Sequence, residues 1–334
     1  MPRFAVLGSG GWGTAMAIAL AEHEEHAVTL WSAREASWKA LLADRENRLQ
    51  LPGVRIPERI RLTADPLEAV AHADCWIVAI PTTFLRATME RFRSLARPDL
   101  PIISLTKGIE ASHFARPSEI LIDVLGMPNI VVVSGPSHAE EVARGLPTSL
   151  VAASSRASLA GWVQQHLGSD RLRVYSNSDC IGVELAGALK NVIGIAAGIC
   201  DGLNFGDNAK AALLTRGLVE MRRFGVAHGA DPGTFSGLAG VGDLITTCFS
   251  VHGRNRRLGE RIARGEPLEV VMSGSQVVEG VYTARSVHER AERTGVDVPI
   301  MAAVYRVLHA GQSPAEAVQD LLSRRQRGEE SFLG

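Results

Sequence analysis

The sequence lacks the features that mark disulfide-bonded proteins, cysteine-ligated zinc proteins and polyanion-binding proteins. It has four cysteines in 334 residues, and Cys75, Cys180, Cys200 and Cys248 lie far apart without a CxxC pair. We therefore expect reduced cysteines in the core and no structural zinc site. The formal net charge is −1, so no overall basic field attracts nucleic acid or an anionic membrane. These absences favour a small molecule as the ligand.

Long apolar runs and a targeting segment are also absent. No uninterrupted apolar run reaches about 18 residues, the length that a membrane span needs. No charged leader with an apolar block and a cleavage site precedes Phe4. We therefore expect a soluble, cytoplasmic protein without a membrane span. No internal repeat at a fixed period is present.

The first half of the chain alternates short apolar runs with helical patterns. Several runs are rich in Val and Ile and are bounded by Gly, Pro or polar residues, which is typical of buried strands. This alternation predicts an α/β fold with a mostly parallel, doubly wound sheet and helices on both faces. The expected strands span residues 3–7, 27–31, 75–80, 102–105, 130–133 and 148–153.

Beyond about residue 178 the pattern changes to long segments rich in alanine and leucine. The expected helices there span residues 182–200, 208–228, 256–264, 283–294 and 299–310. The length of 334 residues also exceeds the usual size of a single core. We therefore expect an α/β domain over residues 1–177, an all-α domain over 178–323 and a polar tail over 324–334 that frays.

A glycine-rich turn follows the first expected strand. Residues 8–13 read GSGGWG and lead into a helical pattern. Gly8, Gly10 and Gly13 would allow a tight turn, close approach of the backbone to a pyrophosphate and close packing of the helix on the strand. The N-terminus of the following helix also suits a phosphate. This context predicts a dinucleotide site in a Rossmann-type domain.

The end of the second expected strand indicates which dinucleotide is bound. NAD enzymes usually place Asp or Glu there, about 20 residues after the glycines, to hold the ribose 2′-hydroxyl. This chain has no carboxylate at the strand end, and Arg34 stands just beyond it. We therefore expect NADP(H), whose 2′-phosphate Arg34 can bind. NAD(H) is the alternative, with Glu35 on the hydroxyl and Arg34 as a solvated turn residue.

Three further segments follow the carboxyl ends of expected strands, where doubly wound sheets bind their ligands. Two of these segments bring Lys107, Gly135 and Ser137 to that edge of the sheet. The surroundings of Lys107 in the sequence are those of an ordinary surface lysine, so its candidacy depends on this placement. Ser137 also suits the N-cap of a helix that runs through Val142, and the two roles are compatible.

The helical half carries one lysine that an apolar helix should exclude. Lys190 lies in the middle of the apolar segment 183–200, and a buried ammonium is costly unless it is paired or used. At about 100° per residue, Gly187, Gly194 and Gly198 lie near the lysine on the helix. We expect this strip of small residues to leave room for a ligand. The alternative is a lysine that reaches the surface along its apolar stem.

Two other segments of the helical half carry candidate site residues. Asp243 stands in apolar surroundings and suits Lys190 as a partner. Arg254 stands near the start of a helical pattern, where cations and free N–H groups suit a phosphate. Arg256 and Arg257 on the same segment are interpreted as a solvated face.

These motifs resemble, in order and spacing, those of bacterial NAD(P)-dependent sn-glycerol-3-phosphate dehydrogenases, and the resemblance covers nearly the whole chain. The Lys190-Asn191 helix and the Arg254-Asn255 pair are its specific part. The matching segments are residues 8–13, 107–108, 135–141, 184–191, 238–247 and 253–256.

The resemblance implies a fold, a reaction and its partners. It implies a Rossmann-type domain joined to an all-α domain like that of 6-phosphogluconate dehydrogenase. Hydride would pass from the reduced nicotinamide to C2 of dihydroxyacetone phosphate while Lys190 donates a proton to the carbonyl oxygen. The product, sn-glycerol 3-phosphate, would supply phospholipid biosynthesis. No metal is expected in this reaction, and a homodimer is left open.

The resemblance also implies roles for single residues. Lys190, Asp243 and Lys107 are expected in catalysis. Substrate contacts are expected from Lys107, Gly135, Ser137, Lys190, Asn191, Asp243, Thr247, Gly253, Arg254 and Asn255. Cofactor contacts are expected from Gly8, Gly10, Gly11, Trp12, Gly13, Arg34, Lys107, Ala139, Arg254, Val277 and Glu279.

Two departures from the family pattern and two rival functions accompany this interpretation. Gly253 stands where the family often has serine, and Ala33 stands where bacterial relatives often carry a basic or histidine side chain. Dehydrogenases of the 3-hydroxyacid and 6-phosphogluconate type are the nearest rival class. An NADP-sensing regulator, in which Lys190 is only structural, is a more distant one, and the lack of a basic DNA-reading segment disfavours it.

Overall fold

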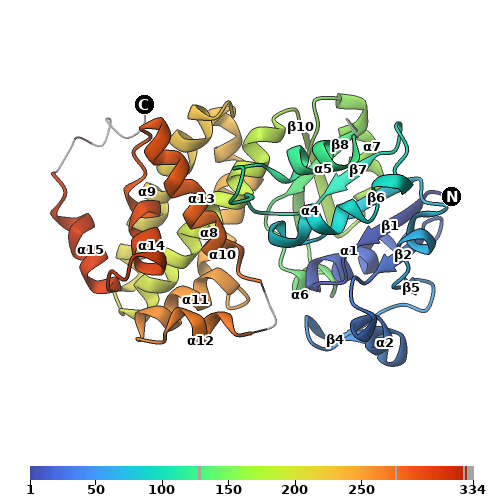
Figure 1. The fold of residues 1–334 in the computed structure, drawn as a ribbon, viewed down its shortest axis with the longest axis horizontal. Coiled ribbons are helices and arrows are strands. Elements are labelled where there is room, and N and C mark those ends of the chain that lie inside the picture. Colours follow the sequence, from blue (N-terminus) through green and yellow to red (C-terminus); the bar gives the residue numbers. More distant parts are fainter. Residues whose placement is uncertain (127–128, 275–276, 326–327, 329–334) are drawn as a thin grey trace. The chain divides into compact units, whose positions relative to one another are not determined.

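The computed structural model describes the chain except residues 127–128, 275–276, 326–327 and 329–334, which include most of the expected tail. The chain folds into two compact units (Figure 1). Unit 1 consists of Met1–Lys107 and Arg116–Cys180, and unit 2 consists of Gly108–Ala115 and Ile181–Gly334. The chain therefore leaves unit 1 at residue 108, returns at residue 116 and leaves again after residue 180.

Unit 1 is built on an eight-stranded sheet. Its strands are β1 (Arg3–Leu7), β2 (Ala27–Trp31), β5 (Arg61–Thr63), β6 (Cys75–Val78), β7 (Ile102–Ser104), β8 (Ile130–Ser134), β9 (Thr148–Ala153) and β10 (Leu172–Asn177). Strands β5-β2-β1-β6-β7-β8 are parallel neighbours in that order, which is the order 3-2-1-4-5-6 of Rossmann folds. β9 pairs antiparallel with β8 and parallel with β10. The predicted doubly wound, mostly parallel sheet is confirmed.

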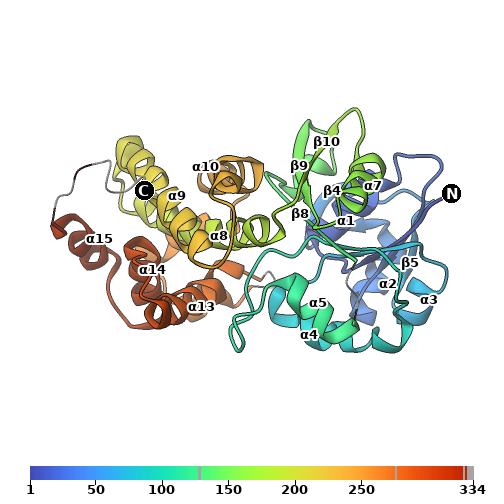
Figure 2. The same ribbon diagram turned by 90° about the horizontal axis from the view of Figure 1, so that it is seen from above.

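Helices cover both faces of this sheet, as Figure 2 shows for α4 and α5 on one face and α7 on the other. The helices of unit 1 are α1 (Gly11–Leu20), α2 (Glu35–Asp44), α3 (Pro66–Val70), α4 (Thr82–Glu90), α5 (Pro117–Leu125), α6 (Ala139–Val142) and α7 (Ala157–Leu167). A short antiparallel hairpin, β3 (Glu46–Asn47) and β4 (Leu51–Arg55), stands apart from the main sheet.

The core of unit 1 lies in the central strands. Val6 of β1 has Leu30 and Ile77 as its partners on the neighbouring strands, and all three side chains are buried. Such apolar strands, buried on both faces, are what a parallel sheet between two helix layers requires. The six expected strands are all present, and their bounds agree to within two residues.

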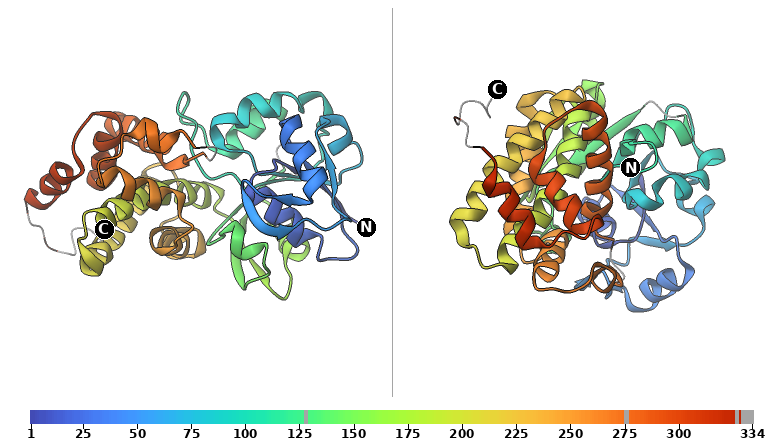
Figure 3. Two further views of the ribbon diagram at one scale, coloured as in Figure 1. Left: turned by 90° about the horizontal axis from the view of Figure 1, so that it is seen from below. Right: turned by 60° about the vertical axis from the view of Figure 1, so that its left-hand side comes forward.

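Unit 2 is helical, and its helices run from yellow-green to red in Figures 1 and 3. They are α8 (Cys180–Gly202), α9 (Gly206–Ala227), α10 (Asp243–Phe249), α11 (Arg254–Ala263), α12 (Leu268–Met272), α13 (Glu279–Thr294), α14 (Pro299–His309) and α15 (Pro314–Ser323). A 3₁₀ turn at Pro232–Ser236 and a π-helical turn at Leu238–Gly242 lead into α10. The predicted all-α region is confirmed, with α10, α12 and α15 in addition to the expected helices.

Helix α8 is the central helix of unit 2. Every residue from Gly182 to Ile199 is buried. Among the described residues it is the one helix long and apolar enough to cross a membrane, and 89% of that apolar window is buried inside the structure. Burial against other helices of the same unit is typical of a core helix.

The segment Gly108–Ala115 joins unit 2 through an aromatic side chain. Phe114 adopts a left-handed φ of 54°, and its ring lies 5.9 Å from the ring of Phe224 and 5.4 Å from that of His228, between centroids. The guanidinium of Arg290 lies 5.1 Å from the centre of the Phe114 ring. A cation over an aromatic face adds to these ring contacts. These contacts explain why Gly108–Ala115 belongs to unit 2, although the chain before and after it belongs to unit 1.

Candidate functional site

The glycine turn lies in unit 1 where the strand order reverses, between β1 and β6. Gly8 has a φ of +119°, and a Cβ there would lie 2.6 Å from the carbonyl oxygen of Ala79. A Cβ on Gly13 would lie 1.9 Å from the carbonyl oxygen of Gly8. Glycine is therefore required at both positions, once for the backbone conformation and once for the close packing of α1 on the turn.

Gly10 has a different environment from the other two glycines. No atom lies within 4 Å of the position that its Cβ would take, and it is the N-cap of α1 without a side-chain hydrogen bond. The first N–H groups of an α-helix have no acceptor within the helix. Trp12, in that first turn, has a buried Nε1 that finds no partner among the described residues. The open turn fits a pyrophosphate, and hence a dinucleotide.

Asn47 fixes this turn from the side, and the sequence patterns did not reveal it. Its side chain is buried, and Nδ2 donates to the carbonyl oxygen of Ser9 and to Oγ1 of Thr14, each at 2.9 Å. Its hairpin also brings the carbonyl oxygen of Gln50 to 2.7 Å from the Cβ position of Gly11. Asn47 and Thr14 are 33 residues apart, so only the folded hairpin brings them together.

The end of β2 carries hydroxyl groups and an exposed arginine. Oγ of Ser9 donates to Oγ of Ser32 at 2.8 Å, and Ser32 in turn donates to the backbone oxygen of Arg34 at 3.3 Å. The Arg34 side chain is exposed at the start of α2. Glu35 pairs with Lys39 at 2.8 Å, and this hydrogen bond lowers the pKa of the Glu35 carboxyl. The strand end thus offers an arginine to a ligand, while Glu35 is engaged on its own helix.

Lys107, Gly135 and Ser137 lie together in unit 1, as the strand ends predicted. Nζ of Lys107 donates to the carbonyl oxygen of Gly135 at 2.8 Å and to Oγ of Ser137 at 3.0 Å. The N-cap role expected for Ser137 is wrong, because α6 has His138 at its N-cap and the Ser137 hydroxyl donates to the Gly135 carbonyl at 2.9 Å. Ala139, the first residue of α6, lies 3.6 Å from the Cβ position of Gly11, beside the glycine turn.

Lys190 is held inside unit 2 by two side chains. Its Nζ donates to Oδ1 of Asp243 at 3.0 Å and to Oγ1 of Thr247 at 2.5 Å. The side chains of Lys190 and Asp243 are 10% and 3% exposed, so the alternative of a lysine that reaches the surface is wrong. Burial raises the pKa of the Cys248 thiol, on the same helix as Asp243, to about 12. Cys248 is therefore a neutral neighbour of the buried ion pair.

The short π-helical turn before α10 places Asp243 at the start of that helix. A Cβ on Gly240 would lie 2.0 Å from the carbonyl oxygen of Phe235, so the turn closes tightly on the segment before it. π-helical turns occur often at functional sites, because they redirect the side chains that follow. Asp243 and Thr247 are four residues apart on α10, so both project from the same face toward Lys190.

The glycine strip of α8 is covered by protein. A Cβ on Gly194 would lie 2.7 Å from Cγ2 of Thr247, and one on Gly198 would lie 1.8 Å from the carbonyl oxygen of Arg256. The expectation that this strip leaves room for a ligand is therefore wrong at these two positions. Small residues on α8 instead allow α10 and α11 to approach its backbone, and this approach places Thr247 against Lys190.

Asn191 and Asn255 connect α8 with α11 and α13. Nδ2 of Asn255 donates to Oδ1 of Asn191 at 2.9 Å, and Oδ1 of Asn255 accepts from the backbone N–H of Gly280 at 3.0 Å. Arg254 donates to the carbonyl oxygen of Val277 at 3.0 Å, while Glu279 is the first residue of α13. The structure thus gathers these expected site residues of unit 2 around the starts of α11 and α13.

Gly253 precedes α11 at its N-cap. A Cβ there would lie 2.8 Å from the carbonyl oxygen of Thr247 and 3.2 Å from that of Ser250. A side chain at this position would require the backbone to shift. In this chain, residue 253 therefore has no side chain to offer a ligand, and its N–H donates to the carbonyl oxygen of Ser250 at 3.2 Å.

Arg256 is part of an internal ionic cluster, so its interpretation as a solvated residue is wrong. Its Nε lies 2.5 Å from Oδ2 of Asp201, and the buried Lys210 lies at the same distance from Oδ1. Asp201 thereby links α8, α9 and α11. Arg257 is exposed and donates only to the carbonyl oxygen of Val251 in the described structure, so its interpretation as a solvated residue is confirmed.

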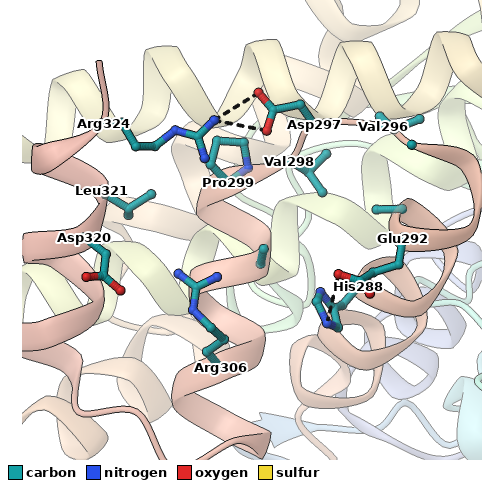
Figure 4. A pocket seen from close by; sticks show the side chains of 13 residues that line it. His288, Glu292, Val296, Asp297, Val298, Pro299, Arg306, Asp320, Leu321 and Arg324 are labelled. Carbon is teal, nitrogen blue, oxygen red and sulfur yellow. Dashed lines mark hydrogen bonds and ion pairs between the residues drawn. The ribbon is translucent and has the colours of Figure 1, made fainter. Parts of the chain in front are cut away.

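A cavity of about 300 Å³ opens elsewhere in unit 2, between α13, α14 and α15 (Figure 4). Arg324 on its wall pairs with Asp297 at 3.2 Å, and Arg306 donates to Gln312 at 2.8 Å. None of the expected site residues lines it, and all of them belong to the described part of the chain. Three carboxylates on its wall, those of Glu292, Asp297 and Asp320, outnumber its two arginines, so the cavity does not resemble an anion site.

Comparison with known proteins identifies relatives over nearly the whole chain. Two family models match, described as the N-terminus and the C-terminus of NAD-dependent glycerol-3-phosphate dehydrogenase, over residues 3–160 and 179–319. The glycerol-3-phosphate dehydrogenase [NAD(P)+] of Chlorobium limicola is 46% identical over 98% of this chain and 99% of its own length. That of Geobacillus kaustophilus is 45% identical over 98% and 96%.

Solved structures agree with these sequence matches. Glycerol-3-phosphate dehydrogenase of Coxiella burnetii superposes with a TM-score of 0.93 at 37% identity, covering 97% of this chain and 99% of that one. The enzyme of Saccharomyces cerevisiae gives a TM-score of 0.81 at 27% identity, with the same two coverages. D-mandelate dehydrogenase, at 15% identity and a TM-score of 0.61, shares the fold.

Proposed function

This chain belongs to the family of NAD-dependent glycerol-3-phosphate dehydrogenases, and we propose that Lys190 is the acid/base of its reaction. The chain is an NAD(P)-dependent oxidoreductase that interconverts dihydroxyacetone phosphate and sn-glycerol 3-phosphate. The observation that carries the proposal is the pair of hydrogen bonds that hold the buried Lys190 ammonium on Asp243 and Thr247.

The geometry at Lys190 suits a proton donor with one position left for substrate. An ammonium has three N–H donors, and Asp243 and Thr247 accept two of them. The third would donate to the C2 oxygen of dihydroxyacetone phosphate and transfer its proton there as that oxygen becomes a hydroxyl. In the reverse direction, neutral Lys190 takes the hydroxyl proton. The nicotinamide supplies the hydride chemistry when it is bound.

The polar groups near the start of α11 would hold the substrate phosphate. Arg254 offers a guanidinium, and Gly253 stands at the N-cap of α11, whose first-turn N–H groups have no acceptor within the helix and suit an anion. We assign Asn255 and Asn191 to substrate contacts as well, and their mutual hydrogen bond would orient both amides. Lys107, Gly135 and Ser137 complete the proposed set of substrate contacts. Lys107 would also contact the cofactor. Together with Lys190 and Asp243 it forms the proposed catalytic group.

The cofactor would bind unit 1 through the glycine turn. Gly10 leaves the first amides of α1 accessible, which is what the pyrophosphate needs. Its proposed neighbours are Gly8, Gly11, Trp12, Gly13, Arg34, Lys107 and Ala139, together with Arg254, Val277 and Glu279 of unit 2. We further propose that Arg34 gives NADP(H) the preference over NAD(H).

The cofactor preference is tested by steady-state kinetics with dihydroxyacetone phosphate. We expect a higher kcat/KM with NADPH than with NADH, and a loss of that preference in Arg34→Ala. Lys39→Ala, which removes a neighbouring exposed cation, is the control. The assignment would be contradicted if the parent enzyme used NADH as well as or better than NADPH, and if Arg34→Ala left both values of kcat/KM unchanged.

Other parts of the proposal concern domains and cellular context. We propose that residues 1–177, apart from the segment Gly108–Ala115 that belongs to unit 2, form the dinucleotide-binding domain, residues 178–323 the substrate domain, and residues 324–334 a tail. We also propose a cytoplasmic homodimer that supplies glycerol phosphate for phospholipid synthesis. Sedimentation of the purified chain measures the oligomeric state, and growth of a deletion strain with and without glycerol tests the supply role.

Lys190→Ala tests the role of the lysine directly. General acid/base groups contribute about 10²–10⁴-fold to turnover, so we expect a loss of that size in kcat. Binding of NADPH, followed by its fluorescence, should be retained. Because this variant leaves Asp243 buried without its ion-pair partner, Lys190→Ala/Asp243→Ala is measured beside it, with thermal unfolding of both. Near-normal turnover in a folded Lys190→Ala enzyme would disprove the role.

A further inference from the structure

Two histidines and a glutamate lie together on the loop of unit 1 that joins α1 to β2. Residues 22–26 read EHEEH. One ligand atom from each of His23, Glu25 and His26 lies within 4.8 Å of the other two. Nδ1 of His23 is 3.9 Å from Oε1 of Glu25. Neither the cofactor turn nor the proposed chemistry uses any of these side chains.

The backbone of this loop is fixed by an arginine from a distant part of the chain. The Nη2 group of Arg59 donates to the carbonyl oxygens of His23 at 3.3 Å, Glu24 at 2.6 Å and His26 at 3.1 Å. The N–H of His26 also donates to the carbonyl oxygen of His23 at 3.0 Å. The three side chains therefore project from a backbone that is already held in one shape.

The His26 imidazole is oriented as metal-bound histidines usually are. Nδ1 of His26 lies 3.2 Å from the carbonyl oxygen of Leu20, and a carbonyl only accepts, so Nδ1 carries the proton and Nε2 keeps its lone pair. A second-shell carbonyl of this kind fixes the tautomer of many metal-bound histidines. Nε2 of His23 is buried and finds no hydrogen-bond partner among the described residues. Native proteins rarely leave such a nitrogen unused.

Aromatic side chains enclose the inner side of the cluster. The ring of His26 meets Phe4 edge-on at 4.9 Å between centroids and stacks at 5.9 Å on His166. His166 stacks in turn on Trp162 at 4.2 Å. This shell leaves the exposed Glu25 as the side of the cluster that meets solvent. An apolar shell of this kind limits solvent access to a bound ion.

We infer that His23, Glu25 and His26 bind one divalent transition-metal ion of the Zn²⁺ class, with water completing its coordination. Two imidazoles and one carboxylate are ligands that zinc accepts, whereas calcium and magnesium prefer oxygen ligands throughout. The exposed Glu24 adds negative charge to the loop, and the Arg59 guanidinium opposes it. Such an ion would link the end of α1, the helix of the cofactor turn, to the start of β2.

Titration of the metal-free enzyme with Zn²⁺ tests this site. Calorimetry should show one ion per chain, and the midpoint of thermal unfolding should rise with Zn²⁺. His23→Gln and Glu25→Gln should each weaken binding by about tenfold or more, since loss of even an outer-shell partner costs about 10–100-fold. His72→Gln, which replaces an exposed histidine elsewhere in unit 1, should bind like the parent enzyme.

Cobalt identifies the ligand atoms. The Co²⁺ form should show visible ligand-field bands without a sulfur-to-cobalt charge-transfer band, because no cysteine belongs to the site. His26 is buried, so the substitutions are made only at the two more accessible ligands, His23 and Glu25. Failure of the parent enzyme to bind Zn²⁺ saturably, equal binding by His23→Gln, or a charge-transfer band that reports cysteine ligation would each overturn the proposal.

Discussion

The two units bury different kinds of polar side chain. Among the described residues, the buried lysines and carboxylates all belong to unit 2, and they are Glu184, Lys190, Lys210, Glu220 and Asp243. The buried polar side chains of unit 1 are a histidine and neutral Ser, Thr and Asn groups, among them Ser32 and Asn47. Buried charges are costly unless they are paired or used, whereas a neutral polar group needs only hydrogen bonds. Unit 1 is thus suited to present backbone amides to a ligand, and unit 2 to present an ionised side chain.

The buried charges of unit 2 are accommodated in two ways. Lys190 and Asp243 pair with each other, and Lys210 pairs with Asp201. Glu220 instead accepts the N–H groups of Ile300 and Met301 at the start of α14, at 2.9 to 3.2 Å. Carboxylates are stabilised at helix N-termini, yet burial raises the pKa of Glu220 to about 8 against the pull of these donors.

Replacement of Glu220 should produce the largest effect, which is a change in how the free energy of unfolding depends on pH. Its folded pKa of about 8 exceeds the ordinary value of 4.5, so the folded state binds a proton more tightly than the unfolded state. Stability from this group is complete below pH 4.5 and is lost as the pH rises toward 8. A tenfold difference in proton affinity between the two states corresponds to about 1.4 kcal/mol, so the change over this range amounts to several kcal/mol.

Urea denaturation between pH 5 and 8 measures this slope. We expect the free energy of unfolding to fall with rising pH over this window in the parent enzyme, and the fall to flatten in Glu220→Gln, whose amide oxygen still accepts from α14. Glu289→Gln, an exposed change on α13, should keep the parent slope. Identical slopes in the parent and Glu220→Gln would mean that protonation of Glu220 is not linked to stability.

Alanine at two glycines should separate packing from ligand access. Gly198→Ala places a Cβ 1.8 Å from the carbonyl oxygen of Arg256 and should destabilise the enzyme by about 1–3 kcal/mol or more through overpacking. Gly10→Ala meets no atom within 4 Å, so stability should fall by no more than about 1 kcal/mol, the cost of alanine at an N-cap, while KM for the dinucleotide rises. Unfolding curves and cofactor kinetics of both variants provide the comparison. A Gly10→Ala enzyme with an unchanged KM would contradict the assignment of this turn to the pyrophosphate.

Asn47→Ala should have a smaller effect, confined to unit 1. The variant leaves the Ser9 carbonyl and the Thr14 hydroxyl without their donor, at a cost of about 1–3 kcal/mol at most. We expect KM for the cofactor to rise severalfold while kcat stays close to that of the parent enzyme, because Asn47 positions the turn. Asn208→Ala, on the exposed side of α9, is the control. Reduced stability with an unchanged KM would assign Asn47 a structural role alone.

The sequence predicted those parts of the fold that depend on local pattern. Six strands and the long helices of unit 2 followed from runs of apolar residues, and the Lys190–Asp243 contact followed from two charges in apolar surroundings. β5 was not predicted because three residues carry too little pattern, and β10 because its exposed and polar residues resemble a loop.

The parts that escaped prediction depend on pairs of distant segments. Asn47 and the glycine turn meet only through the β3–β4 hairpin, and Arg256 finds Asp201 across 55 residues. The glycines of α8 were interpreted as space for a ligand, because the sequence does not reveal that α11 packs its backbone against them. Small residues on a helix are compatible with both outcomes until the packing partner is known.

The excursion of residues Gly108–Ala115 determines how the chain can be divided. The chain passes between the units at three places, so cleavage after Cys180 does not separate two self-contained pieces. A fragment that ends there has every strand of the sheet, yet its Phe114 lacks Phe224 and His228, whose rings lie against it in the intact chain. Such a fragment would expose the aromatic ring of Phe114, so a stable nucleotide-binding module of this enzyme requires a redesigned link between residues 107 and 116.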